Sequence, residues 1–477
     1  MRRSLPWLVV LFALAGCKLG PDYKRAPVDA PPTYRFEDKD AADLVNTAWW
    51  EQFKDPVMND LIKSALAENK DVKIAAARVD EFLGKYGVSR SQMFPQVGAN
   101  ANAANQRATQ SALPAPLPAG VDPQYSSYQA TLSASWEIDV WGKIRRLNEA
   151  ARADLLATEE GRRATILTLV ASVATAYINL SDLDRQLEIA TATAKSRAES
   201  VVVFEKRFKG GVVSEMQLAQ SQSEYEATVA SIPPLQIQIA QQESALSVLL
   251  GRNPGPIIRG RQLAQLELPA VPAGIPSELL ERRPDLRQAE QNLIAANARI
   301  GAAKALYFPT ISLTALFGNV SADLSSLFSG STRVWSFAGD LSVPIFTAGS
   351  IAGVVKQTEA QQQQALLQYQ KSIQSAFKEV EDALVLLQRS REQVASQGRQ
   401  VEALRTYARL ARRRYDSGYT SYIEVLDAER SLFNAELSYA QTQGTIFTSL
   451  VGLYKAMGGG WVVTADGMTG VNATPLP

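Results

Sequence analysis

The stretch that decides the fold is a turn between two long helical patterns, Tyr415-Asp416-Ser417-Gly418-Tyr419-Thr420-Ser421. No proline interrupts the sequence around it, from Ser350 to Met457. In the arm before the turn, apolar or small residues recur at steps of mostly three and four, as in a helix that packs along its length. They are Ile373, Phe377, Val380, Leu384, Leu387, Val394, Val401, Leu404, Ala408, Ala411 and Tyr415. A helix of roughly 65 residues is about 100 Å long, so we expect a strut, a coiled coil or a wall.

The chain contains a second copy of this pattern. The turn aligns with Arg207-Phe208-Lys209-Gly210-Gly211-Val212-Val213-Ser214 at an offset of 207 (Arg414 against Arg207). Further upstream, Phe308-Pro309-Thr310-Ile311 aligns with Phe94-Pro95-Gln96-Val97 at an offset of 214 (308 − 94). The sequence therefore indicates a tandem duplication of a unit of about 210 residues.

The composition excludes several classes of function. The 477 residues carry a formal net charge of +1, no histidine and one cysteine. A nearly neutral chain gives no electrostatic reason to expect nucleic-acid binding. Without histidine there is no Ser-His-Asp triad, no histidine acid–base catalysis and no histidine-ligated metal. A hydrolase has no nucleophile–base signature here, so we expect no enzymatic activity and no metal site.

The N-terminus has the pattern of a bacterial lipoprotein signal. A basic start is followed by an apolar run, from Leu5 to Ala15, that is too short to span a bilayer. The run ends in Leu14-Ala15-Gly16-Cys17, which predicts a signal peptide over 1–16 and lipidation of Cys17. Lys18 is not the aspartate that signals inner-membrane retention, so outer-membrane delivery is expected. The alternative is an ordinary secretory signal with an incidental cysteine.

Composition and the repeat together predict the domain boundaries. We expect an extended tether over 17–43, a first repeat over 44–251, a linker over 252–276, a second repeat over 277–461 and a flexible tail over 462–477. Each repeat should hold a helix (56–92 and 277–306), a β-hairpin (about 96–140 and about 309–346) and a long helical hairpin (about 142–251 and about 349–457). Pro233-Pro234 predicts a break or kink within the second helix of the first hairpin.

The strands show the alternation of a sheet with one apolar and one polar face. From Tyr128 to Val140, aromatic and aliphatic residues alternate with polar ones such as Gln129 and Asp139. This pattern fits strands with lipid outside and water inside, although two solvent-facing hairpins on a soluble domain would also show it. Four strands cannot close a barrel in a membrane. Two chains would give eight strands and a plugged interior, and three would give twelve with room for a pore.

Several motifs, in this order along the chain, resemble the outer-membrane factor (TolC-like) family of efflux channels, in particular its lipoprotein (OprM/NodT-like) branch serving resistance-nodulation-division pumps. They are the lipobox with Gly20-Pro21-Asp22-Tyr23, the Phe94-Pro95 and Phe308-Pro309 pair, Trp141-Gly142, Pro344 to Ser350, Tyr415-x-x-Gly418, Val425-Leu426-Asp427-Ala428 and Tyr454 to Trp461. The resemblance implies an α+β membrane protein, a homotrimer with a 12-stranded outer-membrane β-barrel and a long periplasmic α-helical barrel. Each chain would supply four strands and six main helices.

The resemblance also implies a function and a set of partners. The protein would be the passive outer-membrane channel of a tripartite efflux pump in a Gram-negative bacterium, working with a periplasmic adaptor and an inner-membrane pump. Its only attached group would be the diacylglyceryl and N-acyl lipid on Cys17, with no cofactor. Drugs, solvents, dyes and metals all remain open as substrates. The alternative is a lipid-anchored periplasmic coiled-coil spacer without a pore, against which the polar strand face from Gln129 to Asp139 counts.

By the resemblance, the turns at 208–217 and 415–427 form periplasmic tips that close the tunnel. The candidate constriction residues are Asp427, Glu424, Tyr415, Arg414, Glu215 and Gln217, and the candidate turn residues are Gly211, Ser214, Gly418 and Ser421. Glu424 and Tyr415 also have simpler interpretations. Ser421-x-x-Glu424 predicts a helix-capping box, and Ser214-x-x-Gln217 repeats it in the first half. Tyr415 could be a packing residue only. Many family members have a basic residue where Thr420 stands and an acid where Gln217 stands, so the bonds of the gate are left open.

Overall fold

The computed structural model describes residues 18–28, 30–36, 47–107, 109, 123–269, 271 and 276–470. Cys17 and the predicted signal peptide lie outside these residues, as do 471–477 of the predicted tail. The chain divides into two compact units. The first comprises Met1–Ala26, Asp80–Ala157 and Ala289–Tyr369, and the second comprises Pro27–Val79, Thr158–Gln288 and Gln370–Pro477.

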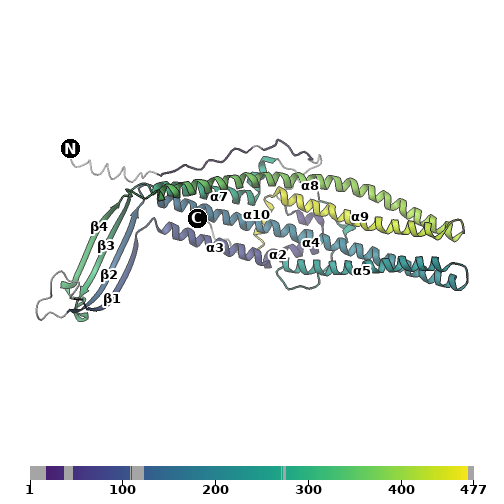
Figure 1. The fold of residues 1–477 in the computed structure, drawn as a ribbon, viewed down its shortest axis with the longest axis horizontal. Coiled ribbons are helices and arrows are strands. Elements are labelled where there is room, and N and C mark those ends of the chain that lie inside the picture. Colours follow the sequence, from purple (N-terminus) through teal and green to yellow (C-terminus); the bar gives the residue numbers. More distant parts are fainter. Residues whose placement is uncertain are drawn as a thin grey trace. The chain divides into compact units, whose positions relative to one another are not determined.

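The first unit contains one antiparallel sheet of four strands in the order β1-β2-β3-β4 (Figure 1). The strands are β1 (Gln96–Arg107), β2 (Gln124–Ile138), β3 (Thr310–Ser321) and β4 (Arg333–Ser342). β2 pairs with β3, so the two hairpins join into one sheet. The sequence predicted a last strand reaching Ile345, but β4 ends at Ser342, shortly before Pro344, which has no N–H to donate to a ladder. Within this sheet, β1 and β4 each keep one unpaired edge.

The register separates apolar from polar side chains. Leu132, Phe317 and Trp335 lie opposite one another across three strands, and in another row Glu137, Ser312 and Asp340 do so. The sheet has little core of its own, because Phe317 is 53% exposed and Trp335 67% exposed. Apolar side chains on a bare sheet face need lipid or another protein surface to cover them.

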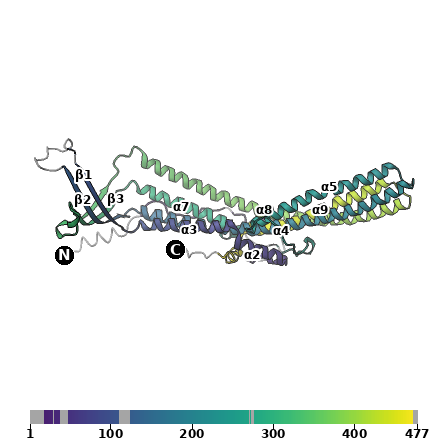
Figure 2. The same cartoon turned by 90° about the horizontal axis from the view of Figure 1, so that it is seen from below.

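Four long helices form two hairpins. They are α4 (Lys143–Lys209) with α5 (Glu215–Leu249), and α8 (Ser350–Asp416) with α9 (Tyr422–Met457). In the second unit, the two hairpins turn at the same end (Figures 1 and 2). α4 includes a window with a mean hydropathy of 1.5, but 61% of that window is buried inside the protein. This window is therefore part of the protein core.

Of the break or kink predicted at Pro233-Pro234, the break is wrong, because α5 is continuous and contains both prolines. Each proline removes one helical N–H and leaves the carbonyl four residues earlier without its usual partner. Both prolines are exposed, as is Ala230, so water can reach this part of the helix. Hydration of the freed carbonyls and packing on either side allow the helix to continue.

The shorter helices are broken where single helices were predicted. In the first repeat, α2 (Pro56–Glu68) and α3 (Lys70–Ser91) are separated by Asn69, whose Oδ1 accepts from the N–H of Asp71 at 2.8 Å. In the second, α6 (Leu279–Arg282) is separated by extended Arg283 from α7 (Pro284–Ala305). Pro284 disfavours helical geometry in the residue before it, which explains the second break.

The C-terminal segment is not a loose tail up to Gly470. Residues Trp461–Asp466 form the helix α10, in which Trp461 and Val462 are buried. Trp461 packs edge-on against Trp49 and Trp50 of the 3-10 helix η1 (Trp49–Phe53), with ring centroids 6.0 and 5.6 Å away. Arg162 on α4 donates to both carboxylate oxygens of Asp466. The small polar residues near Thr464 concealed this docking, which depends on the tryptophan and on one ion pair.

Residues 18–26, here called the strap, are extended along the helices of the first unit. Arg146 on α4 is 1% exposed and donates to the carbonyl oxygens of Leu19 and Gly20 at 2.9 and 3.0 Å. Glu290 on α7 accepts two hydrogen bonds from Arg25, at 2.9 and 2.8 Å. The strap therefore has a fixed register on α4 and α7.

Candidate functional site: the helix turns

The two hairpin turns have the same backbone geometry. After α4, the N–H of Gly211 donates to the carbonyl of Phe208 and that of Val212 to Arg207; after α8, Gly418 donates to Tyr415 and Tyr419 to Arg414. These distances are 2.8–2.9 Å. Gly211 and Gly418 have φ of +71° and +78°. This is the Schellman motif, in which a left-handed residue satisfies the last carbonyls of a helix and glycine is favoured.

The two return helices begin differently. Ser214 and Gln217 form the predicted capping box: Ser214 Oγ accepts from the N–H of Gln217 at 3.3 Å, and Gln217 Oε1 accepts from the N–H of Ser214 at 3.1 Å. The same prediction for Ser421 and Glu424 is wrong, because Ser421 makes no side-chain cap bond.

Glu424 has other partners that explain this difference. Arg414 Nη1 donates to one of its carboxylate oxygens at 3.1 Å, and the hydroxyl of Thr420 donates to the other. The Arg414 guanidinium and the Thr420 hydroxyl bind the Glu424 carboxylate in place of the backbone N–H of Ser421, because hydrogen bonds between ionised partners are the stronger ones. Arg414 and Glu424, both candidate gate residues, are thus paired with each other within one chain.

An aromatic cluster packs the two hairpins together next to the turns. The ring of Phe204 on α4 lies 4.1 Å from that of Tyr422 on α9 and 6.1 Å from that of Tyr415 on α8, measured between centroids. Val425 and Leu426, together with Ala411 and Ala428, complete the buried cluster. Tyr415 is half-buried here, and the Arg207 guanidinium lies 5.8 Å from its ring centroid. Its ring thus packs between hairpins, while its hydroxyl makes no hydrogen bond among the residues the structure describes.

Ion pairs also join the four long helices near the aromatic cluster. Arg207 on α4 faces Asp416 at the end of α8, at 3.7 Å. Arg430 on α9 lies 3.4 Å from Glu224 on α5, which also accepts from Arg197 on α4 at 3.0 Å. Because the Arg207–Asp416 and Arg430–Glu224 pairs cross from one hairpin to the other, separating the hairpins at this end would break both.

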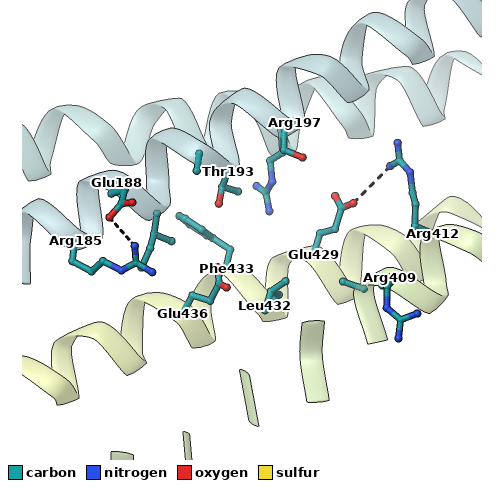
Figure 3. A pocket seen from close by; sticks show the side chains of 14 residues that line it. Arg185, Glu188, Thr193, Arg197, Arg409, Arg412, Glu429, Leu432, Phe433 and Glu436 are labelled. Atoms are coloured by element: carbon teal, nitrogen blue, oxygen red, sulfur yellow. Dashed lines mark hydrogen bonds and ion pairs between the residues drawn. The ribbon is translucent and has the colours of Figure 1, made fainter. Parts of the chain in front are cut away.

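A cavity of about 500 Å³ lies between α4 and the α8–α9 hairpin, beside these ion pairs (Figure 3). Arg197 lies over the ring of Phe433, with 5.6 Å between the guanidinium carbon and the centroid. Glu429 faces Arg412 at 3.6 Å. Burial raises the pKa of Glu429, against the opposing attraction of Arg412 and Arg197. The cavity walls are paired charges and apolar contacts, a lining that suits packing and hydration rather than covalent chemistry.

The remaining candidate residues lie on the surface of the second unit. Asp427 and Glu215 are exposed and make no ion pair or hydrogen bond with any part of the chain that the structure describes. Large apolar side chains are exposed around the turns, namely Val212 (74%), Met216 (66%), Tyr419 (79%) and Ile423 (60%). Both kinds of side chain are available for contacts outside a single chain.

Sequence reasoning missed several contributors. The spacing of apolar residues did not indicate Phe204 and Tyr422 as the aromatic link between the hairpins, because these two residues are far apart in sequence. It also missed the Arg412–Glu429 and Arg430–Glu224 pairs. One signal could have indicated these pairs. Near the turns of both hairpins, arginine and glutamate residues lie beside the apolar positions of the helices, where they can form ion pairs.

Comparison with known proteins decides the family. The family model described as "Outer membrane efflux protein" matches residues 61–252 and 275–459. The chain belongs to this family. It is 38% identical over 471 residues to the probable efflux pump outer membrane protein TtgC of Pseudomonas putida strain KT2440, covering 97% of this chain and 96% of TtgC. It is 35% identical over 458 residues to the probable outer membrane lipoprotein SilC of Salmonella typhimurium, covering 95% and 97%.

Solved structures agree with this assignment. The outer-membrane channel OprN superimposes with a TM-score of 0.86 at 30% identity, covering 94% of this chain and all of that chain. The family predicted from the motifs is thereby confirmed, and so is the predicted outer-membrane location. The protein is an outer-membrane efflux protein of the TolC-like type.

Proposed function

We propose that this protein forms, as a homotrimer, the outer-membrane channel of a tripartite efflux pump. The observation that carries the proposal is the four-stranded sheet with two unpaired edges and opposite apolar and polar faces. An open edge is not tolerated in lipid, so β1 of one chain pairs with β4 of the next. Three chains then give a closed barrel of twelve strands, wide enough for a polar lumen.

The helices extend the same argument. α4 and α8 have 67 residues each, end in the same Schellman turn and begin directly after a strand hairpin. We infer that the chain is an internal duplication in which each half supplies two strands and one long helical hairpin. Three chains would then supply a wall of helices that continues the barrel into the periplasm.

The turns would form the gate at the periplasmic end. Asp427 is exposed and unpaired in the described part of one chain, so threefold symmetry would bring three such carboxylates around an axis. Rings of carboxylates favour cations and set an electrostatic barrier. Glu215 would add to the same field, whereas Glu424 is neutralised by Arg414.

The partners follow from the surface around the turns. Val212, Met216, Tyr419 and Ile423 expose apolar side chains beside charged ones, as protein docking sites do. We propose that a periplasmic adaptor docks there and connects the channel to an inner-membrane pump. A diacylglyceryl and N-acyl lipid on Cys17 would anchor the chain, and no further cofactor is needed for passive conduction.

Conductance in planar bilayers tests the channel. The purified wild-type trimer should give small, discrete conductance steps, and Asp427→Ala should raise the conductance or shift its cation selectivity. Glu226→Ala, an exposed carboxylate further along α5, is the matched control and should leave both unchanged. A trimer that gives no conductance in any variant would instead favour a lipid-anchored periplasmic spacer.

A further inference from the structure

Asp182 on α4 is a carboxylate that the proposed gate does not use. Its Oδ2 accepts from Gln186 Nε2 at 3.0 Å, whereas its Oδ1 is buried and has no hydrogen-bond partner. The part of the chain that the structure describes places no arginine or lysine in an ion pair with it. Other buried acids of the second unit, such as Glu159 and Glu160, do pair with arginine. A buried carboxylate oxygen without a donor is costly when it is ionised.

The environment of Asp182 is the contact between α4 and α9. Gly444 on α9 faces it, and a Cβ at that position would lie 3.2 Å from Cβ and Cγ of Asp182. Gln441 Nε2, also on α9, donates to Gln186 Oε1 at 3.1 Å. A chain of amides therefore runs from α9 through Gln186 to the carboxyl group, and glycine lets α9 approach it closely.

The charges near Asp182 are already used elsewhere. On α4, Arg185 pairs with Glu188 at 2.7 Å. From the linker, Arg259 pairs with Asp184 of α4 and with Glu243 of α5, at 2.7 and 2.5 Å.

α9 carries no charged residue between Glu436 and Lys455. In the described residues of α4, α9 and the linker, no positive charge near the carboxyl group is therefore left to compensate it.

We propose that Asp182 is a proton-operated contact, which holds α4 and α9 together when protonated and loosens them when ionised. The neutral acid removes the uncompensated charge from the interface. The ionised form needs water or a cation at Oδ1, and we expect that admitting either moves α9 away from α4, which it approaches closely at Gly444.

The direction of the pH effect follows from the pKa. Burial raises the pKa of Asp182 from 3.8 to about 6, and the bond from Gln186 only partly opposes this. An acid whose pKa is higher in the packed state stabilises that state at low pH. The contact is strongest below pH 3.8 and weakens as the pH rises to about 6. It would therefore respond to mild acidification of the periplasm.

Hydrogen exchange on the purified full-length protein tests this proposal without any measurement of conduction. The readout is the exchange of α9 amides around Gln441 to Leu450, at about pH 5 and about pH 7.5, corrected for the intrinsic pH dependence of exchange. With pKa values of about 6 packed and 3.8 separated, the corrected rate should rise about tenfold between these pH values. Asp182→Asn is isosteric and should keep the contact protected at both.

Asp184→Asn is the matched control, because Asp184 is two residues away on the same helix and already pairs with Arg259. This variant should keep the tenfold pH response of the wild type. Equal corrected rates in the wild type at both pH values would overturn the proposal, and so would an unchanged pH response in Asp182→Asn. The wild-type measurement decides even if a variant fails to fold, and either result leaves the proposed channel function unaffected.

Discussion

Arg146 holds the backbone of a distant segment: its Nε donates to the carbonyl oxygen of Leu19 at 2.9 Å. The same guanidinium reaches the carboxylate of Asp22 at 3.0 Å. An arginine that is 1% exposed and donates to two backbone carbonyls as well as to one carboxylate binds both the backbone conformation and a side chain of the segment. The strap is therefore part of the folded first unit.

Replacing Arg146 with alanine should release the strap. The variant loses several charge-assisted hydrogen bonds, which are worth about 1.5–3 kcal/mol each, so the bonds to Leu19 and Gly20 no longer oppose detachment. Limited trypsin digestion with mass spectrometry should show faster cleavage after Lys24 and Arg25. Arg299→Ala removes a different ion pair between α7 and α4, with Asp154, and should leave this cleavage slow. Equal rates in the wild type and Arg146→Ala would contradict the assignment.

Asp55 should be among the residues least tolerant of substitution. Its side chain is fully buried and accepts from the N–H of Val57, the hydroxyl of Tyr177 and the N–H of Arg261, at 2.9, 2.9 and 3.1 Å. Asp55→Ala removes a helix cap and leaves buried donors unpaired, so we expect a loss of about 3 kcal/mol or more in unfolding free energy. Denaturant titration measures it.

Asp60→Ala is the control for this change, because Asp60 is exposed on the same helix, α2. Its effect should stay within about 0.5 kcal/mol. If the two variants unfold at the same denaturant concentration, Asp55 does not link α2, α4 and the linker as its contacts indicate.

The two helix starts at the turns should respond unequally to the same substitution. Ser214→Ala removes a capping bond and should cost about 1 kcal/mol locally. Ser421→Ala removes no side-chain cap, since none exists, and should cost much less. Exchange rates of the amides in the first turns of α5 and α9 report each effect separately. Similar acceleration at both starts would show that the serines cap their helices alike.

Acid should weaken the docking of α10. Glu159 is buried, which raises its pKa, but the hydrogen bond from Arg162 and the charges of Arg162 and Arg163 outweigh this and lower the pKa below 4.5. An acid with a lowered pKa stabilises the fold above pH 4.5, and this contribution is lost as the pH falls below it. Arg162 binds Glu159 and Asp466 together, so protonation of Glu159 disturbs the ion pair that holds α10.

Unfolding free energies measured from about pH 3 to pH 7 should therefore decline at the acid end, and Glu159→Gln should flatten that decline. The substitution should also lower the stability near neutral pH. If the unfolding free energy of Glu159→Gln declines at low pH as steeply as that of the wild type, other carboxylates account for the loss of stability in acid.

The parts of the fold that depend on local spacing could be predicted from the sequence. The β1 strand begins at Gln96, where the first β-hairpin was predicted to begin, and α8 begins one residue after Gly349. The period of two or of three to four residues reports directly which face is apolar. The identical turns at Gly211 and Gly418 follow in the same way from glycine at a left-handed position.

The features that were missed depend on contacts between distant residues. Glu424 fits a capping box by spacing alone, but its carboxylate accepts hydrogen bonds from Arg414 and Thr420 instead. Trp461 docks α10 by packing against Trp49 and Trp50, which lie more than 400 positions upstream (461 − 49 = 412). Pro233 and Pro234 fit inside α5 because that stretch is open to solvent. None of these outcomes can be predicted from the helix or strand propensities of a short stretch of sequence.

The unpaired edges of β1 and β4 have a genetic consequence. If each sheet is completed only by its neighbours, a chain with a damaged β4 edge spoils any assembly that includes it, even when the other chains are intact. With random mixing of equal amounts of normal and damaged chains, only about one trimer in eight would be free of damage. Such alleles should therefore be dominant, whereas alleles that prevent synthesis should be recessive.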